Sequence, residues 1–277
     1  MNYDPIKKDL GAVFNQSTFL RKTFYKLLDL LLLRTWHVHR ELKAWMKNKS
    51  SAKILDAGSG FGQYSFYLAK RNKQYSIDAL DVKEEQIADC NLFFKKCGLV
   101  NANFAFGDLT KSIAQNKYDL VLCVDVMEHI LEDVTVFKNF NQAMKPGAML
   151  LISTPSDQGG SDVHEETGES FIGEHVRDGY PYEEMAGKLK EAGFNKFEIL
   201  YSYGQPGKIA WKLSMKYPML TLNKSKAFFA LMPFYYALTY PFSYLLNWAD
   251  TYTRHSSGTG LIVKAWKDIV AVHEPVI

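Results

Sequence analysis

The sequence has few cysteines and almost no net charge, and each shortage excludes a class of protein. Three cysteines in 277 residues, Cys90, Cys97 and Cys123, form no metal-binding cluster, and their odd number argues against a disulfide framework. The 33 Lys and Arg residues exceed the 30 Asp and Glu residues by 3, too small a basic excess to indicate a dedicated nucleic-acid binder. Residues 1–10 lack the charged start and apolar stretch of a secretory signal, so we expect a reducing, cytoplasmic setting.

The chain also lacks internal repeats and low-complexity tracts, which excludes a fibrous protein. Hydrophobic residues make up 47% of the sequence, enough apolar surface to offset the entropy lost on folding, so the chain is not intrinsically disordered. Aromatic residues make up 14%, and about a third of them fall within residues 201–252. This clustering predicts an apolar patch with a function rather than general core.

Periodicity divides the chain into four parts. Residues 1–50 are predicted as an N-terminal helical cap, with helices over 18–34 and 36–47, which either packs on the core or covers a substrate pocket. Residues 51–203 alternate strands and helices and form the expected core. Residues 204–258 are an aromatic helical insert, and residues 259–277 hold the last core strand and a tail.

The predicted strands cover residues 53–56, 75–81, 103–106, 118–124, 148–153, 196–201 and 260–266. The predicted core helices cover residues 62–71, 84–97, 134–144 and 182–192. Strands separated by helices form βαβ units, so we expect an α/β fold with a largely parallel sheet and helices on both faces. Cys123, inside an apolar strand, is expected in the core.

A glycine-rich turn follows the first predicted strand. It reads Asp56-Ala-Gly-Ser-Gly-Phe-Gly62, and glycines allow a tight turn and close approach of a ligand to the main chain. A carboxylate directly before the turn would repel a pyrophosphate at the helix N-terminus, which disfavours a nicotinamide dinucleotide. The same carboxylate would attract a ligand that carries an ammonium and a sulfonium, as S-adenosylmethionine does.

Two more aspartates follow the next strands. Asp81 ends the second strand, where an acidic residue typically binds a ribose diol, and Asp108 follows the third, where it could accept a hydrogen bond from an adenine amine. Each alone could equally be a helix cap or a turn residue. Because the carboxyl ends of parallel strands form the ligand-binding edge of an α/β sheet, their joint placement favours a cofactor site.

In these stretches the sequence resembles the class I S-adenosylmethionine-dependent methyltransferases. The matching segments are Lys53–Gly62, Leu80–Val82, Gly107–Leu109, Tyr118–Ile130 and Leu150–Pro155. The resemblance implies a Rossmann-like seven-stranded sheet whose last strand, 260–266, is antiparallel. It implies S-adenosylmethionine as cofactor and S-adenosylhomocysteine as product. The cofactor-binding residues that it implies are Asp56, Gly58, Gly60, Gly62, Asp81, Val82, Asp108, Leu109 and Asp125.

Within the class, residues Asp125–His129 followed by Ser153–Pro155 look most like the ubiquinone-biosynthesis O-methyltransferase group. Methyl transfer to a hydroxyl or amine needs an acceptor held in line and a group that takes its proton. His129, just past the central strand, is one catalytic candidate, because histidine titrates in the useful range. The alternative is a histidine that orients its loop by hydrogen bonding.

Glu174 and His175 are the other catalytic candidates, in the loop 171–180, which also holds Arg177. The alternative is a surface loop tied by a Glu174–Arg177 ion pair. A divalent metal is conceivable but not favoured, and no metal ligands are predicted. It would need Asp125, Glu128 and His129 with His164 or His175 as mixed oxygen and nitrogen ligands.

The insert suggests how an apolar acceptor is handled. No charged residue interrupts residues 227–249, and five lysines lie between 208 and 226. Pro233, Pro241 and several tyrosines disfavour a membrane crossing. Three alternatives stay open for residues 208–250: an internal cap on the acceptor pocket, a peripheral membrane contact at the cytoplasmic face, and a homodimer interface.

The sequence therefore predicts an S-adenosylmethionine-dependent methyltransferase that methylates an oxygen of a hydrophobic or aromatic small molecule. N- or C-methylation of a similar acceptor is the first alternative, and a non-catalytic, cofactor-binding assembly partner is the second. A nucleic-acid substrate is not expected, because no base-flipping Asn-Pro-Pro-Tyr-type tetrapeptide follows the central strand.

Overall fold

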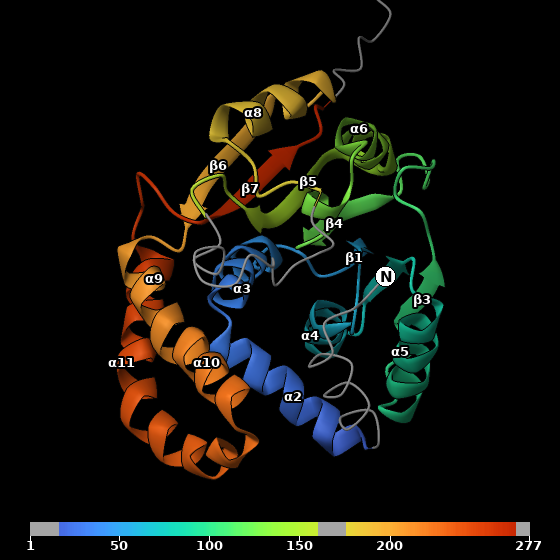
Figure 1. Ribbon diagram of the computed structural model, residues 1–277. Coiled ribbons are helices and arrows are strands. Elements are labelled where there is room, and N and C mark those ends of the chain that lie inside the picture. Colours follow the sequence, from blue (N-terminus) through green and yellow to red (C-terminus); the bar gives the residue numbers. More distant parts are fainter. Residues whose placement is uncertain (1–16, 160–175, 270–277) are drawn as a thin grey trace, which may run out of the picture. The chain divides into compact units, whose positions relative to one another are not determined.

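The computed structural model describes residues 17–159 and 176–269 (Figure 1). The chain forms two compact units. The first, which we call the helical unit, comprises the described residues 17–47, 155–159, 176–179 and 200–262. The second, the sheet unit, comprises the described residues 48–154, 180–199 and 263–269. The segments predicted as a cap and as an insert thus belong to one unit, although more than 150 residues of sequence separate them.

Seven strands form one sheet in the order β3-β2-β1-β4-β5-β7-β6. The strands are β1 (Ala52–Ala57), β2 (Tyr75–Asp81), β3 (Ala102–Phe106), β4 (Tyr118–Val124), β5 (Met144–Pro155), β6 (Lys196–Ser202) and β7 (Gly260–Trp266). The pairs from β3 through β5 are parallel. Hydrogen bonds join Gly147 to Lys267 near one end of β5 and Ser156 to Thr259 at the other, so β7 runs antiparallel to it. The predicted seven-stranded α/β fold is confirmed.

The helices of the sheet unit are α4 (Gln63–Arg71), α5 (Glu84–Lys96), α6 (Asp133–Ala143) and α8 (Tyr182–Glu191). All four agree closely with the predicted ranges. Helices α5 and α8 each begin with two glutamates and end with two lysines in the terminal turns, charges that favour the helix dipole. A 3-10 turn, η1 (Met127–His129), follows β4.

The strand order reverses between β1 and β4. From β1 the chain steps outward to β2 and β3, and from β4 it steps the other way to β5. Because parallel crossovers are right-handed, α4 and α5 cover one face of the sheet and α6 covers the other (Figure 1). The carboxyl ends of β1 and β4 therefore meet at a topological switch point, where open α/β sheets bind ligands.

The central strands are nearly continuous apolar runs, as expected for strands covered on both faces. Their fully buried side chains include Ile54, Leu55, Leu120, Val121, Leu122, Cys123, Leu150, Leu151 and Ile152. The prediction that Cys123 is a core residue is confirmed.

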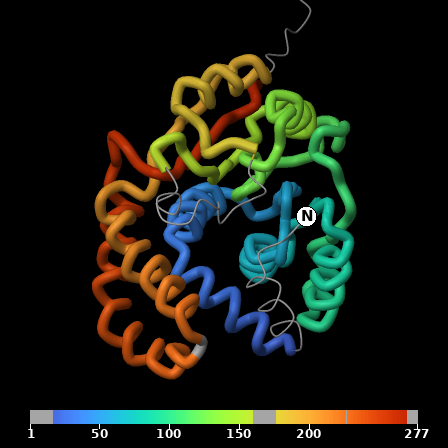
Figure 2. The backbone as a smooth tube through the Cα atoms, viewed as in Figure 1, coloured from blue at the N-terminus to red at the C-terminus, as the bar shows by residue number. Residues whose placement is uncertain are grey.

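The helical unit contains α2 (Thr18–Leu31), α3 (Leu33–Met46), α9 (Gln205–Trp211), α10 (Tyr217–Lys224) and α11 (Met232–Tyr252). A π-helical segment, η2 (Lys212–Lys216), joins α9 to α10, and a 3-10 segment, η3 (Lys226–Leu231), leads into α11. Helix α11 returns beside α9, η2 and α3, so that the chain from 205 to 252 forms a long helical hairpin (Figure 2). Among the described helices, none is both long enough and apolar enough to cross a membrane.

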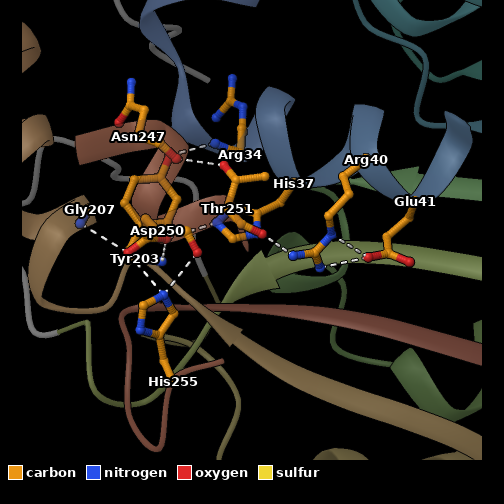
Figure 3. A network of polar contacts seen from close by, with 10 residues as sticks. All are labelled: Arg34, His37, Arg40, Glu41, Tyr203, Gly207, Asn247, Asp250, Thr251 and His255. Carbon is orange, nitrogen blue, oxygen red and sulfur yellow. Dashed lines mark hydrogen bonds and ion pairs between the residues drawn. The ribbon is translucent and has the colours of Figure 1, made fainter. Parts of the chain in front are cut away.

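Asp250 anchors α11 inside the helical unit (Figure 3). Its fully buried carboxylate lies 2.8 Å from His37 Nε2 and 3.2 Å from His255 Nε2. It also accepts the backbone amides of Gly207 at 2.9 Å and Tyr203 at 3.1 Å. Burial lowers the pKa of His37, so its ring is uncharged at neutral pH and donates a hydrogen bond to the carboxylate. One side chain thus joins α3, the start of α9 and the end of α11.

We expect Asp250→Ala to lower the free energy of unfolding by about 3 to 5 kcal/mol, because several buried donors lose their common acceptor. Urea denaturation at neutral pH measures this loss. Asp157→Ala, at an exposed aspartate of the same unit, is the matched control and should change the value by less than about 0.5 kcal/mol. Equal effects of the two substitutions would show that the buried network contributes nothing.

Candidate functional site

The glycine-rich turn connects β1 to α4 at the switch point. Gly58, Gly60 and Gly62 have φ angles of +77°, +50° and +74°, in the left-handed region that other residues avoid. The amides of Gly58 and Ser59 donate to the Leu80 carbonyl at 2.8 and 2.9 Å. The turn is therefore fixed against the end of β2.

The three glycines meet different surroundings. A Cβ at Gly58 would lie 2.3 Å from Val126, and a Cβ at Gly62 would lie 2.9 Å from Phe104, so both glycines allow close packing. A Cβ at Gly60 would have no atom of the described chain within 4 Å. The turn is open at Gly60, and this is where a ligand can approach the main chain.

Asp56 is a buried carboxyl group at the end of β1. Its exposed fraction is 3%, and the Ser65 hydroxyl donates to it at 2.6 Å. Burial raises the pKa of Asp56 to about 6, the Ser65 hydrogen bonds oppose the rise, and the nearby charge of Asp81 adds to it. At neutral pH the group is mostly ionised and would be stabilised by a cationic ligand group.

Asp81 bonds the glycine turn and the residue that precedes α5. Its Oδ2 accepts the amide of Gly60 at 2.8 Å, and its Oδ1 accepts the amide of Lys83 at 2.9 Å. A carboxylate oxygen has two lone pairs, so each oxygen can still accept a bond from a ribose diol. The neighbouring Val82 is 57% exposed. Asp81 thus shapes the turn, a role that the sequence did not predict, and its predicted ribose contact stays a prediction.

Asp108 forms a local turn. Its Oδ1 accepts the amide and the hydroxyl of Thr110, at 2.9 and 2.7 Å, and these bonds lower the pKa of Asp108. Leu109, the next residue, is buried. Asp108 is therefore a turn residue, which was one of the two expectations. The predicted adenine contacts of Asp108 and Leu109 stay predictions.

The end of β4 carries a strained residue and a buried acid. Asp125 has a φ of +52°, uncommon for a residue with a side chain, and its amide donates to Ser153 at 2.8 Å. Glu128 is 1% exposed and accepts the hydroxyl of Thr154 at 3.1 Å. Backbone strain of this kind clusters at functional sites, so it supports the placement of Asp125 in the site.

The carboxylates at the ends of β1 and β4 share one region of negative potential. Burial raises the pKa of the Cys123 thiol well above its usual range, and the charges of Glu128, Asp56 and Asp125 add to the rise. Asp56, Asp125 and Glu128 therefore contribute to one negative environment around this thiol. In the sequence analysis Glu128 is only a conceivable metal ligand. In the structure it is buried in the turn that follows β4, beside the site.

Of the three catalytic candidates, only His129 lies within the described residues. His129 closes the turn η1, is exposed, and donates its amide to Val126 at 3.0 Å. Glu174 and His175, like His164, lie outside the described residues. Over residues 17–159 and 176–269, no group of three or more His, Cys, Asp or Glu side chains is arranged to hold a metal ion.

Comparison with known proteins decides the family. A family model described as a methyltransferase domain matches residues 48–201, more than half of the chain. This chain belongs to the methyltransferase domain family. The predicted resemblance to the class I S-adenosylmethionine-dependent methyltransferases is confirmed.

Two curated relatives show the range of the family. Phosphoethanolamine N-methyltransferase 1 of Triticum aestivum is 28% identical over 160 residues, which are 57% of this chain and 27% of the relative. Ubiquinone biosynthesis O-methyltransferase of Rickettsia prowazekii (strain Madrid E) is 25% identical over 122 residues, which are 44% of this chain and 47% of the relative. The chain thus spans less than half the length of either, and the two differ in the atom that their names say is methylated.

A solved structure agrees in fold. Phosphoethanolamine N-methyltransferase 2 of Haemonchus contortus, determined in complex with S-adenosyl-L-methionine, has a TM-score of 0.59 at 18% identity. The alignment covers 88% of this methyltransferase chain and 60% of the other. At this identity the likeness shows the fold alone.

The residues of the methyltransferase site fit S-adenosylmethionine. The Ser59 hydroxyl is buried in the glycine turn and has no hydrogen-bond partner within the described chain, which is costly unless a ligand supplies one. The open space at Gly60 adjoins it, and the acids at the strand ends suit a cationic ligand. A serine between two glycines gives no sequence signal of this kind, because its burial depends on how the turn folds.

The raised pKa of Asp56 predicts that the stability of the fold decreases as the pH rises. A carboxyl group with a higher pKa in the folded state favours folding when protonated, and that contribution is lost as the pH rises through about 6. Above this pH the buried charge costs on the order of 3 kcal/mol. We therefore expect Asp56→Asn to raise the free energy of unfolding at pH 8 by about 1 to 3 kcal/mol, and by less at pH 5.

Urea denaturation at the two pH values measures this difference, with Asp157→Asn as the exposed control. A gain for Asp56→Asn at pH 8 that is no larger than at pH 5 would contradict the burial of an ionised Asp56.

Gly60 tests the cofactor site, and Gly98 is its matched control outside the site. Both have positive φ angles, and a Cβ at either would meet nothing within 4 Å, but Gly98 lies after α5 and outside the turn. Alanine at either position should cost about 1 to 2 kcal/mol of stability through backbone strain. Only Gly60→Ala should weaken binding of S-adenosylmethionine, by at least about tenfold, because its methyl group fills the open space. Calorimetry measures both affinities, and equal affinities for the two variants would place the cofactor elsewhere.

Proposed function

We propose that this protein transfers a methyl group from S-adenosylmethionine to an oxygen atom of a hydrophobic or aromatic small molecule and releases S-adenosylhomocysteine. One observation carries the proposal: the glycine turn is open at Gly60, its Gly60 amide donates to Asp81 at the end of β2, and its buried Ser59 hydroxyl has no hydrogen-bond partner among the described residues. This arrangement lies in the family-matched segment 48–201.

The chain's own residues would bind and orient the two reactants. Asp56 would balance a cationic group of the cofactor, and Asp81 would accept the ribose hydroxyls while it holds the turn through Gly60. Asp108 and Leu109 would flank the adenine, and Asp125 would close the pocket. When bound, the cofactor supplies an electrophilic methyl group on a sulfonium, and binding both reactants in line lowers the entropy cost of the displacement.

A hydroxyl acceptor must lose its proton during transfer, and His129 is the proposed general base. It is exposed and lies at the carboxyl end of β4, on the same strand edge as Asp125. His175 and Glu174 are the second candidates for this role.

The hydrophobic nature of the acceptor is supported by the helical unit. Residues 208–250 expose many large apolar side chains, which a strictly polar acceptor would not need. As a lid, a membrane contact at the cytoplasmic face or a homodimer interface, this segment would serve an apolar acceptor. N-methylation is the alternative that a relative's name supports, and a non-catalytic, cofactor-binding assembly partner is the alternative from another class.

Incubation of the protein and cofactor with fractionated apolar metabolites tests the proposal. We expect one component to gain ~14 Da, the replacement of a hydrogen by a methyl group, with stoichiometric formation of S-adenosylhomocysteine. Fragmentation of the product locates the methyl group on oxygen, nitrogen or carbon. Cofactor binding without turnover on any fraction would favour the non-catalytic alternative.

We expect His129→Ala to lower turnover by about 10² to 10⁴-fold while the affinity for S-adenosylmethionine is unchanged. Loss of the base should also flatten the acidic limb of the pH–rate profile, which a merely structural role would not do. Leu131→Ala, at an exposed neighbour, is the control. If His129→Ala and His175→Ala combined retain full turnover, general base catalysis by histidine is wrong.

A further inference from the structure

Helix α11 presents its polar residues inward and its apolar residues outward. Its buried residues are all polar: Ser243, Asn247, Asp250 and Thr251. Six large apolar or aromatic side chains are each more than half exposed, namely Phe234, Leu238, Phe242, Leu245, Trp248 and Tyr252. A surface helix of a globular protein normally has the opposite arrangement.

The exposed side chains form one continuous stripe. Their successive separations of four, four, three, three and four residues match the repeat of an α-helix, so they lie along a single face. The helix has 21 residues, which gives the stripe a length of about 30 Å. No charged residue interrupts the chain from 227 to 249. Contiguous apolar surface of this extent marks an interaction site.

Hydrogen bonds fix the orientation of the helix. Tyr235 and Tyr236 donate their hydroxyls to the carbonyls of Leu213 and Ser214 in the π-helical segment η2, at 2.7 and 2.8 Å. Tyr240 donates to the Leu30 carbonyl at 3.1 Å. These three tyrosines thus hold the inner face of α11 against its neighbours.

The end of the helix is held in the same way. Asp250 joins His37 and His255, and Arg40 donates to the carbonyl of Thr251 (Figure 3). Rotation of α11 to bury its apolar stripe would break all of these contacts. The outward stripe is therefore a fixed property of the fold of this unit.

The hairpin that carries the stripe is strongly basic. Residues 205–249 contain five lysines and no Asp, Glu or Arg, a formal charge of +5. The rest of the chain has 33 − 5 = 28 basic against 30 acidic residues, a charge of −2. Lys212 and Lys224 are exposed on the arm that precedes α11.

We propose that α11 docks on the surface of an anionic lipid bilayer, with its axis in the plane of the membrane and its apolar stripe among the acyl chains. Apolar burial and lysine attraction to anionic headgroups act together in such helices. Trp248 and Tyr252, at one end of the stripe, are the residue types that favour the membrane–water boundary. A second copy of the chain would bring another hairpin with a charge of +5 against this one, whereas anionic headgroups compensate that charge.

The inference deepens the proposed function, on which its last step rests: a hydrophobic acceptor would be taken from the lipid phase. Docking itself needs no methyl transfer. Binding to vesicles and binding of S-adenosylmethionine in solution are separate measurements, so the failure of one is distinguishable from the failure of the other.

Sedimentation of the full chain with vesicles tests the proposal. The probes are pure phosphatidylcholine vesicles and vesicles enriched in phosphatidylglycerol. We expect clear binding to the anionic vesicles that weakens with added salt, and a fall of at least about tenfold for the double variant Leu238→Glu, Phe242→Glu. Both side chains are exposed, so the variant should keep the melting temperature of the parent protein.

Val100→Glu is the apolar control, because Val100 is 95% exposed on the sheet unit and outside the stripe, and it should bind as the parent does. For the lysines, Lys212→Glu with Lys224→Glu should weaken binding to anionic vesicles at least about tenfold, whereas Lys73→Glu with Lys95→Glu should not.

Absence of vesicle binding by the parent protein would overturn the proposal, and so would undiminished binding by the stripe variant. Light scattering without lipid adds a third outcome. A dimer that Leu238→Glu, Phe242→Glu dissociates would show that a second copy covers the stripe, and it would also overturn the proposal.

Discussion

The hydrogen bond from the Gly60 amide to Asp81 Oδ2, 2.8 Å long, joins the turn after β1 to the end of β2, and the site depends on it. It holds Gly60 in a left-handed conformation with one side open. It also keeps the Asp81 charge near Asp56, where burial and that charge raise the pKa of Asp56 to about 6. A buried carboxylate beside a turn with an open main chain suits a cationic adenosyl ligand better than a pyrophosphate.

The strand ranges, the glycine turn and the order of the acidic residues along the chain were predictable from the sequence, because apolar periodicity and turn residues indicate them. The antiparallel last strand was implied by the family resemblance, and the order of the strands in the sheet came from the structure. The carboxyl ends of parallel strands must meet at one edge, so Asp56, Asp81 and Asp125 gather there whatever their side chains do. The Asp56–Ser65 bond and the orphaned Ser59 hydroxyl were not predictable. Both depend on the direction of individual side chains, which a linear pattern does not contain.

The insert shows the limit more clearly. Its apolar run leaves three alternatives open, namely a cap on the acceptor pocket, a peripheral membrane contact and a homodimer interface. What decides the inward face of α11 is a set of distant partners, such as His37 for Asp250, which lies 213 residues further along the chain. Such a long-range contact forms only in the folded chain and cannot be read from a local pattern. It turns the apolar stripe outward and makes the helical unit, rather than the sheet unit, the candidate for contact with lipid.

The central claim is that the switch-point turn of this methyltransferase binds S-adenosylmethionine. Isothermal calorimetric titration of the full chain with S-adenosylmethionine, S-adenosylhomocysteine and NAD tests it most directly. The account predicts saturable binding of both adenosyl ligands at one site per chain, with no heat of binding for NAD. A chain that binds neither adenosyl ligand, or that binds NAD in their place, would contradict the account.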